Sequence, residues 1–412
     1  MALNPQSKST PVRTVFNSSQ VYRGYSLNSS WSLGPEDIMN NMTGILLRFR
    51  EDIVGAQGDI TKMYYMIRIS IDGQMMQLFI WRFEGEKEIR TFCMTRLTMG
   101  NKISSNFSII AVNETAELQD FPTKFPDAYE ALTKNTYVDN VLVVKPTVEE
   151  IKKTIEQIEF VSAQGGFFYK PWIISGQDVP HQVIPVALPN AVSVEEERAL
   201  GMNWNVLEDT FSVNAGAVLG GGKKGGEAVT VVVEDNKSLI LNPTLKLSLR
   251  ICLSIHAKAY DPLGFVFPTK MVGAILFRKT LQFINAKFPV SKAECKGQKG
   301  KIRWDFQISD FGGEDNFLSS WVKYFGMLMS LEDVTFPRSH KPENVDDDIK
   351  PDLITFSDGN EDAYGCIAYA RWTLLDGTRV ANLIMSKAKL GPLTHKGEVV
   401  KNELSGANML QG

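Results

Sequence analysis

The sequence predicts an α+β fold in which a sheet is backed by helices. Three consecutive segments carry this prediction. Residues 137–144, within "NTYVDNVLVV", indicate strand, turn and strand, residues 147–164 have a helical pattern, and residues 166–174 indicate another strand. Segments in this order form a sheet with helices packed against it.

Earlier residues favour short strands joined by turns. The apolar segments 63–71 ("MYYMIRISI") and 75–83 ("MMQLFIWRF") flank the turn residues "DGQ". A Gly-containing turn between two such segments is typical of a β-hairpin, so we expect one over residues 63–83.

The helix over 147–164 has the clearest pattern in the chain. Thr147 and Glu150 have capping-box spacing, and Ile151, Ile155 and Ile158 fall on one helical face. A Gly-Gly pair follows and is expected to end the helix.

The second half of the chain contains two candidate linkers. Residues 214–226 ("NAGAVLGGGKKGG") are predicted to be flexible, and residues 339–352 are charged and flanked by prolines. Residues 246–286 are predicted to be mostly helical around "DPLG" (261–264). Residues 353–372 indicate strand, turn and strand at the start of another α/β unit.

Composition excludes some functions. The chain has 412 residues with 44 basic and 47 acidic side chains, a net charge of −3, whereas a dedicated nucleic-acid coat protein would be basic. A locally basic cleft remains compatible with this charge. The four cysteines form no CxxC pair, which argues against a zinc ribbon and favours a reduced, intracellular chain.

No apolar run is long enough to cross a bilayer, and the N-terminus lacks an apolar signal core. We therefore expect an intracellular protein. We expect both ends of this sequence to be cut ends.

Several common chemistries lack support. In "GAVLGGGKK", Lys224 stands where a phosphate loop needs Ser or Thr, so a linker is the better interpretation. The four histidines are not paired at metal-ligand spacing, and no D-[ST]-G triplet of an aspartic peptidase occurs.

Two acids remain as candidates. Asp59 follows a glycine turn at a strand, and Asp139 lies at the tip of the 137–144 hairpin. Each alone is more often a turn aspartate. Nucleotidyl transfer, however, needs acids on neighbouring strands that hold a pair of divalent ions, and Mg²⁺ prefers carboxylate oxygens.

The order of motifs resembles one family over nearly the whole chain. The series "TPVRTVFNSSQVYRGYSLNSSW", "GDITKMYY", "TRLTMGNKISSNFS", "YVDN", "GGFFYKPW", "RALGMNW", "YDPLGFVFP", "FSDGNEDAYGCIAYARW" and "KNELSGA" is similar to the Pol polyprotein of BEL/Pao-type LTR retrotransposons, covering reverse transcriptase and the start of RNase H. Each motif is weak alone, but the ordered series is specific.

The resemblance implies a right-hand polymerase with palm, fingers and thumb, then a connection region and a truncated RNase H-like α/β unit. The implied domains are 1–213 (fingers and palm, N-terminally truncated), 214–226 (linker), 227–338 (thumb and connection), 339–352 (linker) and 353–412 (N-terminal part of RNase H).

The resemblance also assigns catalytic residues. Asp59 matches the first palm aspartate, Asp139 the first aspartate of the Y-x-D-D hairpin, and Lys170 the lysine proposed to protonate the leaving pyrophosphate. Asp59 and Asp139 would hold Mg²⁺ (or Mn²⁺), with Asn140 as a weak neutral ligand.

Further matches concern the substrates. Arg13 matches the fingers arginine that grips the triphosphate, Tyr64 the aromatic under the nucleotide sugar that rejects a 2′-hydroxyl, and Gly100 the glycine of the loop that packs on the nucleotide and template. The segment that grips the primer end is matched by Leu200, Gly201 and Trp204.

In the RNase H part, Asp358 matches the first acid and Glu403 the second, so the site is expected to be incomplete within this chain.

This chain departs from the family pattern at several positions. Asn140 replaces the second hairpin aspartate, Asn17 stands where "VFD" is usual, and "LTMGNKISS" lacks the aromatic and the proline of the form L-x-F-G-L-x-S-x-P. The loss of one carboxylate predicts strongly reduced or absent polymerase activity.

The resemblance therefore implies an RNA-directed DNA polymerase, impaired at Asn140, whose partners are an RNA template, a DNA primer and dNTPs, without a membrane. It also implies a location in the cytoplasm (in a virus-like particle) or in the nucleus. An alternative is a catalytically dead remnant that binds nucleic acid or a protein partner. A peptidase is a third, weaker alternative.

Overall fold

The computed structural model describes residues 2–3, 12–13, 16–31, 38–177, 181, 183, 196–213, 231–234, 238–241, 247–287, 304–308, 317–331, 333–346, 348–393 and 398–410. The chain divides into two units, one comprising Met1–Glu195 with Val206–Glu208 and the other Glu196–Asn205 with Asp209–Gly412. Segment 196–205, placed by sequence in the first domain, lies in the second unit. The predicted linker 214–226 falls outside the described residues.

The first unit is built on a four-stranded antiparallel sheet in the order β6-β7-β3-β8. Its central strands are β3 (Val54–Asp59) and β7 (Asn140–Lys145), flanked by β6 (Thr136–Tyr137) and β8 (Ile173–Ile174). The register pairs Val54 with Lys145 and Asp59 with Asn140. The predicted hairpin over 137–144 is thereby confirmed, whereas the strand expected over 166–174 is regular only at β8.

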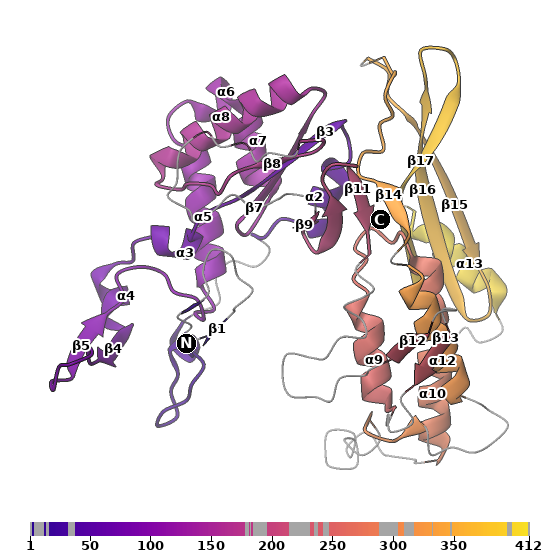
Figure 1. The fold of residues 1–412 in the computed structure, drawn as a ribbon, viewed down its shortest axis with the longest axis horizontal. Coiled ribbons are helices and arrows are strands. Elements are labelled where there is room, and N and C mark those ends of the chain that lie inside the picture. Colours follow the sequence, from indigo (N-terminus) through magenta and orange to yellow (C-terminus); the bar gives the residue numbers. More distant parts are fainter. Residues whose placement is uncertain are drawn as a thin grey trace. The chain divides into compact units, whose positions relative to one another are not determined.

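Helices α7 (Pro126–Lys134) and α8 (Val148–Gln164) pack on this sheet, and α5 (Ser104–Ala116) packs on both helices (Figure 1). The prediction for α8 is confirmed at both ends. The Thr147 hydroxyl accepts a hydrogen bond from the Glu150 N–H at 3.2 Å, and Gly165 is the C-cap. Ile151, Ile155 and Ile158 are fully buried, so the predicted apolar face is the one that meets the sheet.

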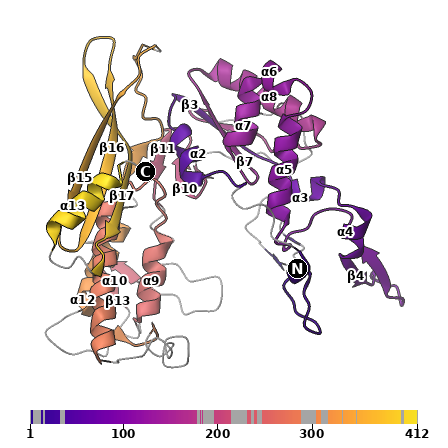
Figure 2. The same ribbon diagram turned by 180° about the vertical axis from the view of Figure 1, so that it is seen from behind.

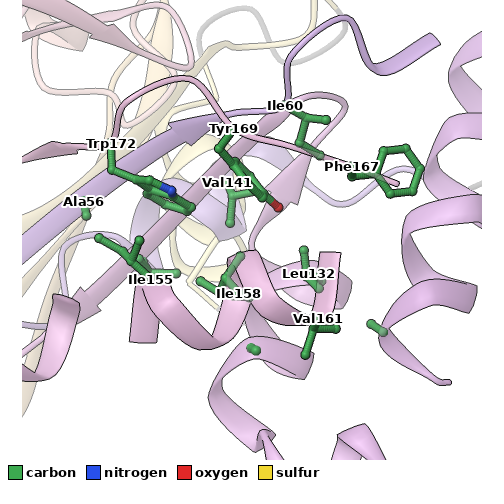
Figure 3. Packing of buried hydrophobic residues seen from close by; sticks show 14 of the residues in the cluster. Ala56, Ile60, Leu132, Val141, Ile155, Ile158, Val161, Phe167, Tyr169 and Trp172 are labelled. Carbon is green, nitrogen blue, oxygen red and sulfur yellow. The ribbon is translucent and has the colours of Figure 1, made fainter. Parts of the chain in front are cut away.

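The core of the first unit lies between α8 and the sheet. Figure 3 shows Ile155 and Ile158 of α8 directed toward Tyr169, Trp172 and Val141. The Trp172 indole N–H donates to the buried Glu159 carboxylate at 3.0 Å, so the polar atom of this ring is satisfied inside the core. Gly58 in β3 lies against the same ring, and a Cβ there would come within 2.6 Å of it.

The remaining segments of the first unit are short. Their helices are α1 (Leu27–Ser30), α2 (Met42–Arg48), α3 (Met63–Met66), α4 (Ile71–Met75) and α6 (Phe121–Lys124). Two antiparallel pairs join β1 (Ala2–Leu3) with β2 (Val12–Arg13) and β4 (Leu78–Trp81) with β5 (Arg90–Cys93).

The hairpin predicted over 63–83 is therefore wrong, because α3 and α4 occupy its first half. Ser70 caps α4 by accepting from the Gly73 N–H at 3.3 Å, which favours helix where "DGQ" suggested a turn. The hairpin in this region joins β4 and β5, with Gly85 at φ +81° between them.

The second unit contains an antiparallel sheet in the order β14-β11-β10-β9. Its strands are β9 (Glu196–Ala199), β10 (Met202–Asn205), β11 (Thr210–Ser212) and β14 (Thr335–Pro337). A separate pair joins β12 (Val231–Glu234) and β13 (Ser238–Leu241).

Three helices form the second core: α9 (Leu249–Lys258), α10 (Phe267–Lys287) and α12 (Phe317–Met329). The predicted helical region around "DPLG" is confirmed. Close approach of α10 and α12 depends on Gly273, where a Cβ would come within 2.1 Å of the Tyr324 ring. Burial lowers the pKa of His256, which hydrogen-bonds the Tyr324 hydroxyl at 2.7 Å, to about 4.

The "DPLG" loop connects the helices to a third sheet. Asp261 is buried, and its carboxylate accepts from the N–H groups of Phe265 and Val266 at 2.9 Å each, at the start of α10. Burial raises the pKa of Asp261, against the lowering effect of these N–H bonds. The Leu263 carbonyl accepts from the Ser386 N–H at 2.9 Å.

That sheet has the order β15-β16-β17, formed by β15 (Asp352–Gly359), β16 (Ala363–Thr373) and β17 (Arg379–Leu390). The strand–turn–strand prediction for 353–372 is confirmed. Helix α13 (Val399–Asn408) packs on β15 and β16 (Figure 2).

Over the described ranges, no helix combines the length and apolar character needed to cross a membrane. Cys93, Cys252 and Cys366 are free thiols.

The contact of Gly58 with Trp172 gives a stability prediction. Gly58→Ala should lower the free energy of unfolding by about 1–3 kcal/mol, because the added methyl group overpacks the core. Gly44→Ala in α2 is the matched control: its Cβ would meet nothing closer than 3.5 Å, and Ala favours a helix by up to about 1 kcal/mol. Denaturant unfolding of both variants measures the difference. Equal effects of the two changes would contradict this account of the core.

Candidate active site

The tip of the β6–β7 hairpin holds Asp139. Tyr137 pairs with Asn140, which leaves Val138 and Asp139 as a two-residue connection. Val138 has φ +54°, in the left-handed region that β-branched residues avoid. Two-residue hairpin turns require positive φ, so the turn imposes this strain, which costs on the order of 1–3 kcal/mol.

Asp59 ends β3 at the same end of the sheet. It lies directly opposite Asn140. At the next position along the two strands, the Ile60 N–H donates a hydrogen bond to the Asp139 carbonyl at 2.8 Å. The two acids are therefore one residue apart across adjacent strands. Pairing of β3 with β7 is what brings residues 59 and 139 together.

Lys170 joins this pair from the segment that precedes β8. Its N–H donates to the Asp59 carbonyl at 2.9 Å, and its Nζ lies 2.9 Å from Asp59 Oδ2. Both side chains are about one third exposed (37% and 32%), so the ion pair is open to solvent and contributes modestly to stability. Its main effect is local, since it places a positive charge on one oxygen of Asp59.

Asn140 replaces a charge with an amide. Its Nδ2 donates to Asp139 Oδ1 at 3.3 Å, a long hydrogen bond that an aspartate at this position could not make. Asp139 and Asn140 therefore lie at the hairpin, and the Asp59–Lys170 ion pair lies at the adjoining end of β3.

The carboxylate oxygens of Asp59 and Asp139 and the amide oxygen of Asn140 are hard ligands. They therefore suit a single divalent cation in type and charge. In the part of the chain that the structure describes, no group of three or more His, Cys, Asp or Glu side chains is arranged to hold a metal ion.

Tyr64 lies in α3, one turn of helix that follows Lys62 at φ +51°. The ring is half-buried, and its hydroxyl is 3.0 Å from Ser105 Oγ in the first turn of α5. Sequence reasoning named Tyr64 but missed Ser105.

Gly100 occupies a position that no other residue fits. Its φ is +109°, and a Cβ would come within 2.0 Å of the Phe16 carbonyl oxygen. The Phe16 N–H donates to the Met99 carbonyl at 3.2 Å, so the loop is fixed against residue 16. Asn101, next in the loop, is buried and donates to Gln77 Oε1 at 2.8 Å.

Arg13 lies in β2 opposite Ala2. Its side chain is outside the described part of the structure, so its predicted contact with a triphosphate stays a prediction.

The predicted primer-grip residues belong to the second unit, where they form the β9–β10 hairpin. Leu200 (φ +46°) and Gly201 (φ +95°) are its two-residue turn, and the Tyr260 ring lies against Gly201, 2.8 Å from where a Cβ would be. Trp204 is fully buried, and its indole N–H donates to Asp209 at 2.9 Å. Trp204 therefore supports the hairpin from the core, and Leu200 and Gly201 form its tip.

Asp209 also accepts from Arg338, a residue 129 positions away. Arg338 Nε and Nη2 lie 2.7 and 2.8 Å from the two carboxylate oxygens, and the arginine side chain is fully buried. This pair joins β11 to β14 beside the predicted grip. Its large separation along the chain left no local signal by which sequence could reveal it.

The two predicted RNase H acids lie on adjoining elements, Asp358 on β15 and Glu403 on α13. Asp358 is exposed at the end of β15, and α13 crosses it so closely that a Cβ at Gly359 would lie 2.5 Å from the Glu403 nitrogen. Gly406 likewise packs against the Asp358 backbone. Glycines at both positions permit this crossing.

The chain is similar to known proteins in sequence and in fold. Residues 248–411 match the family described as Pao retrotransposon-like RNaseH-like domain. No curated protein matches the chain. A structure of the foamy viral protease-reverse transcriptase dRH in complex with double-stranded DNA is similar over 97% of this chain, with a TM-score of 0.51 and 13% sequence identity.

Two further foamy viral protease-reverse transcriptase structures match with lower TM-scores. The complex with an RNA/DNA hybrid has a TM-score of 0.46 and 13% identity, covering 94% of this chain and 40% of that one. A complex with double-stranded DNA has a TM-score of 0.41 and 15% identity, covering 95% and 61%.

The first of these comparisons shows the fold, a mixed α/β architecture like that of a retroviral reverse transcriptase. This chain spans about half (53%) of that protein's length.

The strained turn gives a second stability prediction. Val138→Asn should leave the free energy of unfolding unchanged or raise it by up to about 1 kcal/mol, because Asn tolerates positive φ. Val143→Asn in the buried part of β7 should lower it by about 2 kcal/mol or more, since it buries an amide in the core. Thermal unfolding compares the two. A loss at Val138 as large as that at Val143 would rule out backbone strain at the turn.

Proposed function

We propose that this chain, whose residues 248–411 match the Pao retrotransposon-like RNaseH-like domain family, is an RNA-directed DNA polymerase whose catalytic centre lies at Asp59, Asp139 and Lys170. The observation that carries the proposal is the pairing of β3 with β7, which brings two acids from distant segments to one sheet end beside a lysine. Carboxylates that can hold divalent ions suit phosphoryl chemistry.

In the proposed reaction the primer 3′-hydroxyl attacks the α-phosphorus of a dNTP and pyrophosphate leaves. Asp59, Asp139 and, weakly, Asn140 would hold Mg²⁺ or Mn²⁺, which stabilises charge on the attacking and leaving oxygens when bound. Lys170 is the acid for the leaving pyrophosphate. For this role its Nζ must leave Asp59 Oδ2, and a cation held by the Asp59 carboxylate would compete with Nζ for that group.

The other proposed roles are those that the resemblance implies. Tyr64 contacts the nucleotide sugar, the Gly100 loop packs on the nucleotide, and Arg13 grips the triphosphate. Leu200 and Gly201, at the hairpin tip, contact the primer, with Trp204 holding them from the core. Asp358 and Glu403 are proposed as two acids of the RNase H-like site.

The proposed partners are an RNA template, a DNA primer and dNTPs. The similar foamy viral proteins are seen in complex with double-stranded DNA or an RNA/DNA hybrid. Because the net charge of this chain is −3, binding would depend on local contacts with phosphates and would weaken as salt rises.

A non-catalytic remnant that retains nucleic-acid binding is the second candidate function, favoured by Asn140.

One substitution distinguishes the polymerase from the non-catalytic remnant. Asn140→Asp should raise the primer-extension rate by at least about tenfold, because it restores a charged ligand at the hairpin. The assay uses the 412-residue chain with an RNA template, a DNA primer, dNTPs and Mg²⁺.

Asn344→Asp is the matched control, an identical change at an exposed position of the second unit. It should leave the rate unchanged. Equal and robust rates for the unaltered chain and Asn140→Asp would contradict the predicted impairment. No extension by either protein, with primer–template still bound, would favour the remnant.

Competition between Lys170 and a cation gives a separate prediction. Lys170→Met should tighten Mn²⁺ binding roughly two- to fivefold, the scale of one partly exposed charge contact. Free Mn²⁺ measured by EPR reports this affinity without catalysis. Lys145→Met is the matched control, since Lys145 pairs with Asp127 at 2.8 Å at the other end of β7 and should leave the affinity unchanged. Weaker Mn²⁺ binding by Lys170→Met would show that the two cations do not compete.

A further inference from the structure

We propose that Ser105 is a positioning residue that fixes the Tyr64 ring and thereby sharpens discrimination between deoxyribose and ribose. This inference rests on the proposed polymerase function, in which Tyr64 contacts the nucleotide sugar. The contact that carries it is the 3.0 Å hydrogen bond between the Tyr64 hydroxyl and Ser105 Oγ.

The backbone around Tyr64 does little to hold the ring. Helix α3 is only four residues long and is preceded by Lys62 in a left-handed conformation. Rotation about the Cα–Cβ bond swings the whole half-buried ring together with its hydroxyl, so the ring can move unless its hydroxyl end is held. Ser105 holds that end.

Ser105 is itself well fixed. It follows the buried Ser104, whose hydroxyl donates to the Thr98 carbonyl at 2.8 Å. Thr98 precedes the Gly100 loop, which is held against Phe16. Contacts therefore link the Gly100 loop, through Ser104 at the start of α5, to Ser105 and the Tyr64 hydroxyl.

The family form of this loop has a different residue at the position of Ser105. In the form L-x-F-G-L-x-S-x-P, the last position corresponds to Ser105 when Gly100 is aligned with the glycine. Proline has no hydroxyl and could not make the bond. The departure at Ser105 thus adds a contact to Tyr64 that the usual residue lacks.

A purely structural role would predict a different result from a positioning role. If the bond only tied α3 to α5, its loss would change stability and would weaken binding of both nucleotides equally. If it positions the ring, its loss changes the ratio of affinities for dATP and ATP, because only ATP carries the 2′-hydroxyl that the ring must reject.

The experiment measures equilibrium binding of dATP and of ATP to the 412-residue chain on a primer–template with a dideoxy-terminated primer and Mn²⁺. The unaltered chain should prefer dATP. Ser105→Ala and Tyr64→Phe should each reduce this preference roughly fivefold, the scale of one hydrogen bond. The double variant should lose no more than either single one, because both changes remove the same bond.

Two controls sharpen the test. Ser108→Ala, in the same helix, removes a hydroxyl that donates at 2.7 Å only to the Ser104 carbonyl, and it should leave the preference unchanged. Ser105→Thr retains a hydroxyl and should retain the preference. An unchanged dATP/ATP ratio in Ser105→Ala, with nucleotide still bound, overturns the role of Ser105 and leaves the proposed function standing. Failure of the unaltered chain to bind either nucleotide overturns both.

Discussion

The antiparallel pairing of β3 with β7 is the constraint on which the first unit depends. It sets Asp59 opposite Asn140 and places Asp139 beside Ile60, so the candidate site exists only in this register. A shift of one residue would move every side chain of a strand to the other face of the sheet. The buried isoleucines of α8 prevent such a shift, because they pack on apolar residues of the same strands, among them Ala56 and Val141. The helix therefore contributes to the site without containing any of its polar residues.

Local signals in the sequence are sufficient to predict regular elements that have strong patterns. The cap and apolar face of α8 and the β6–β7 hairpin could be predicted because capping, periodicity and turn chemistry act over a few residues. The hairpin expected over 63–83 could not, because the same residues also suit short helices. The cap at Ser70 and the left-handed Lys62 decide between these alternatives, and the sequence pattern does not rank them.

The candidate site was predicted as a set of residue types, and its contacts were not. Asp59, Asp139 and Lys170 were named from motifs, but the ion pair between Lys170 and Asp59 depends on how the segment before β8 returns to β3. Ser105 and Arg338 were missed for a related reason: each makes its contact across a gap of 41 or 129 residues. Trp204 is predicted to be part of the segment that grips the primer end, and its complete burial gives it a supporting position in that segment.

The pairing of Arg338 with Asp209 also constrains how the second unit forms. Strand β14 completes a sheet whose other strands lie between residues 196 and 212, so this sheet stays open until the chain beyond α12 is available. Contacts between residues so far apart form late, since a long loop must close first. During synthesis on a ribosome, β11 therefore spends a long interval as an exposed edge while the helices are being made. Until β14 arrives, that edge is the part of the nascent chain most open to incorrect strand pairing.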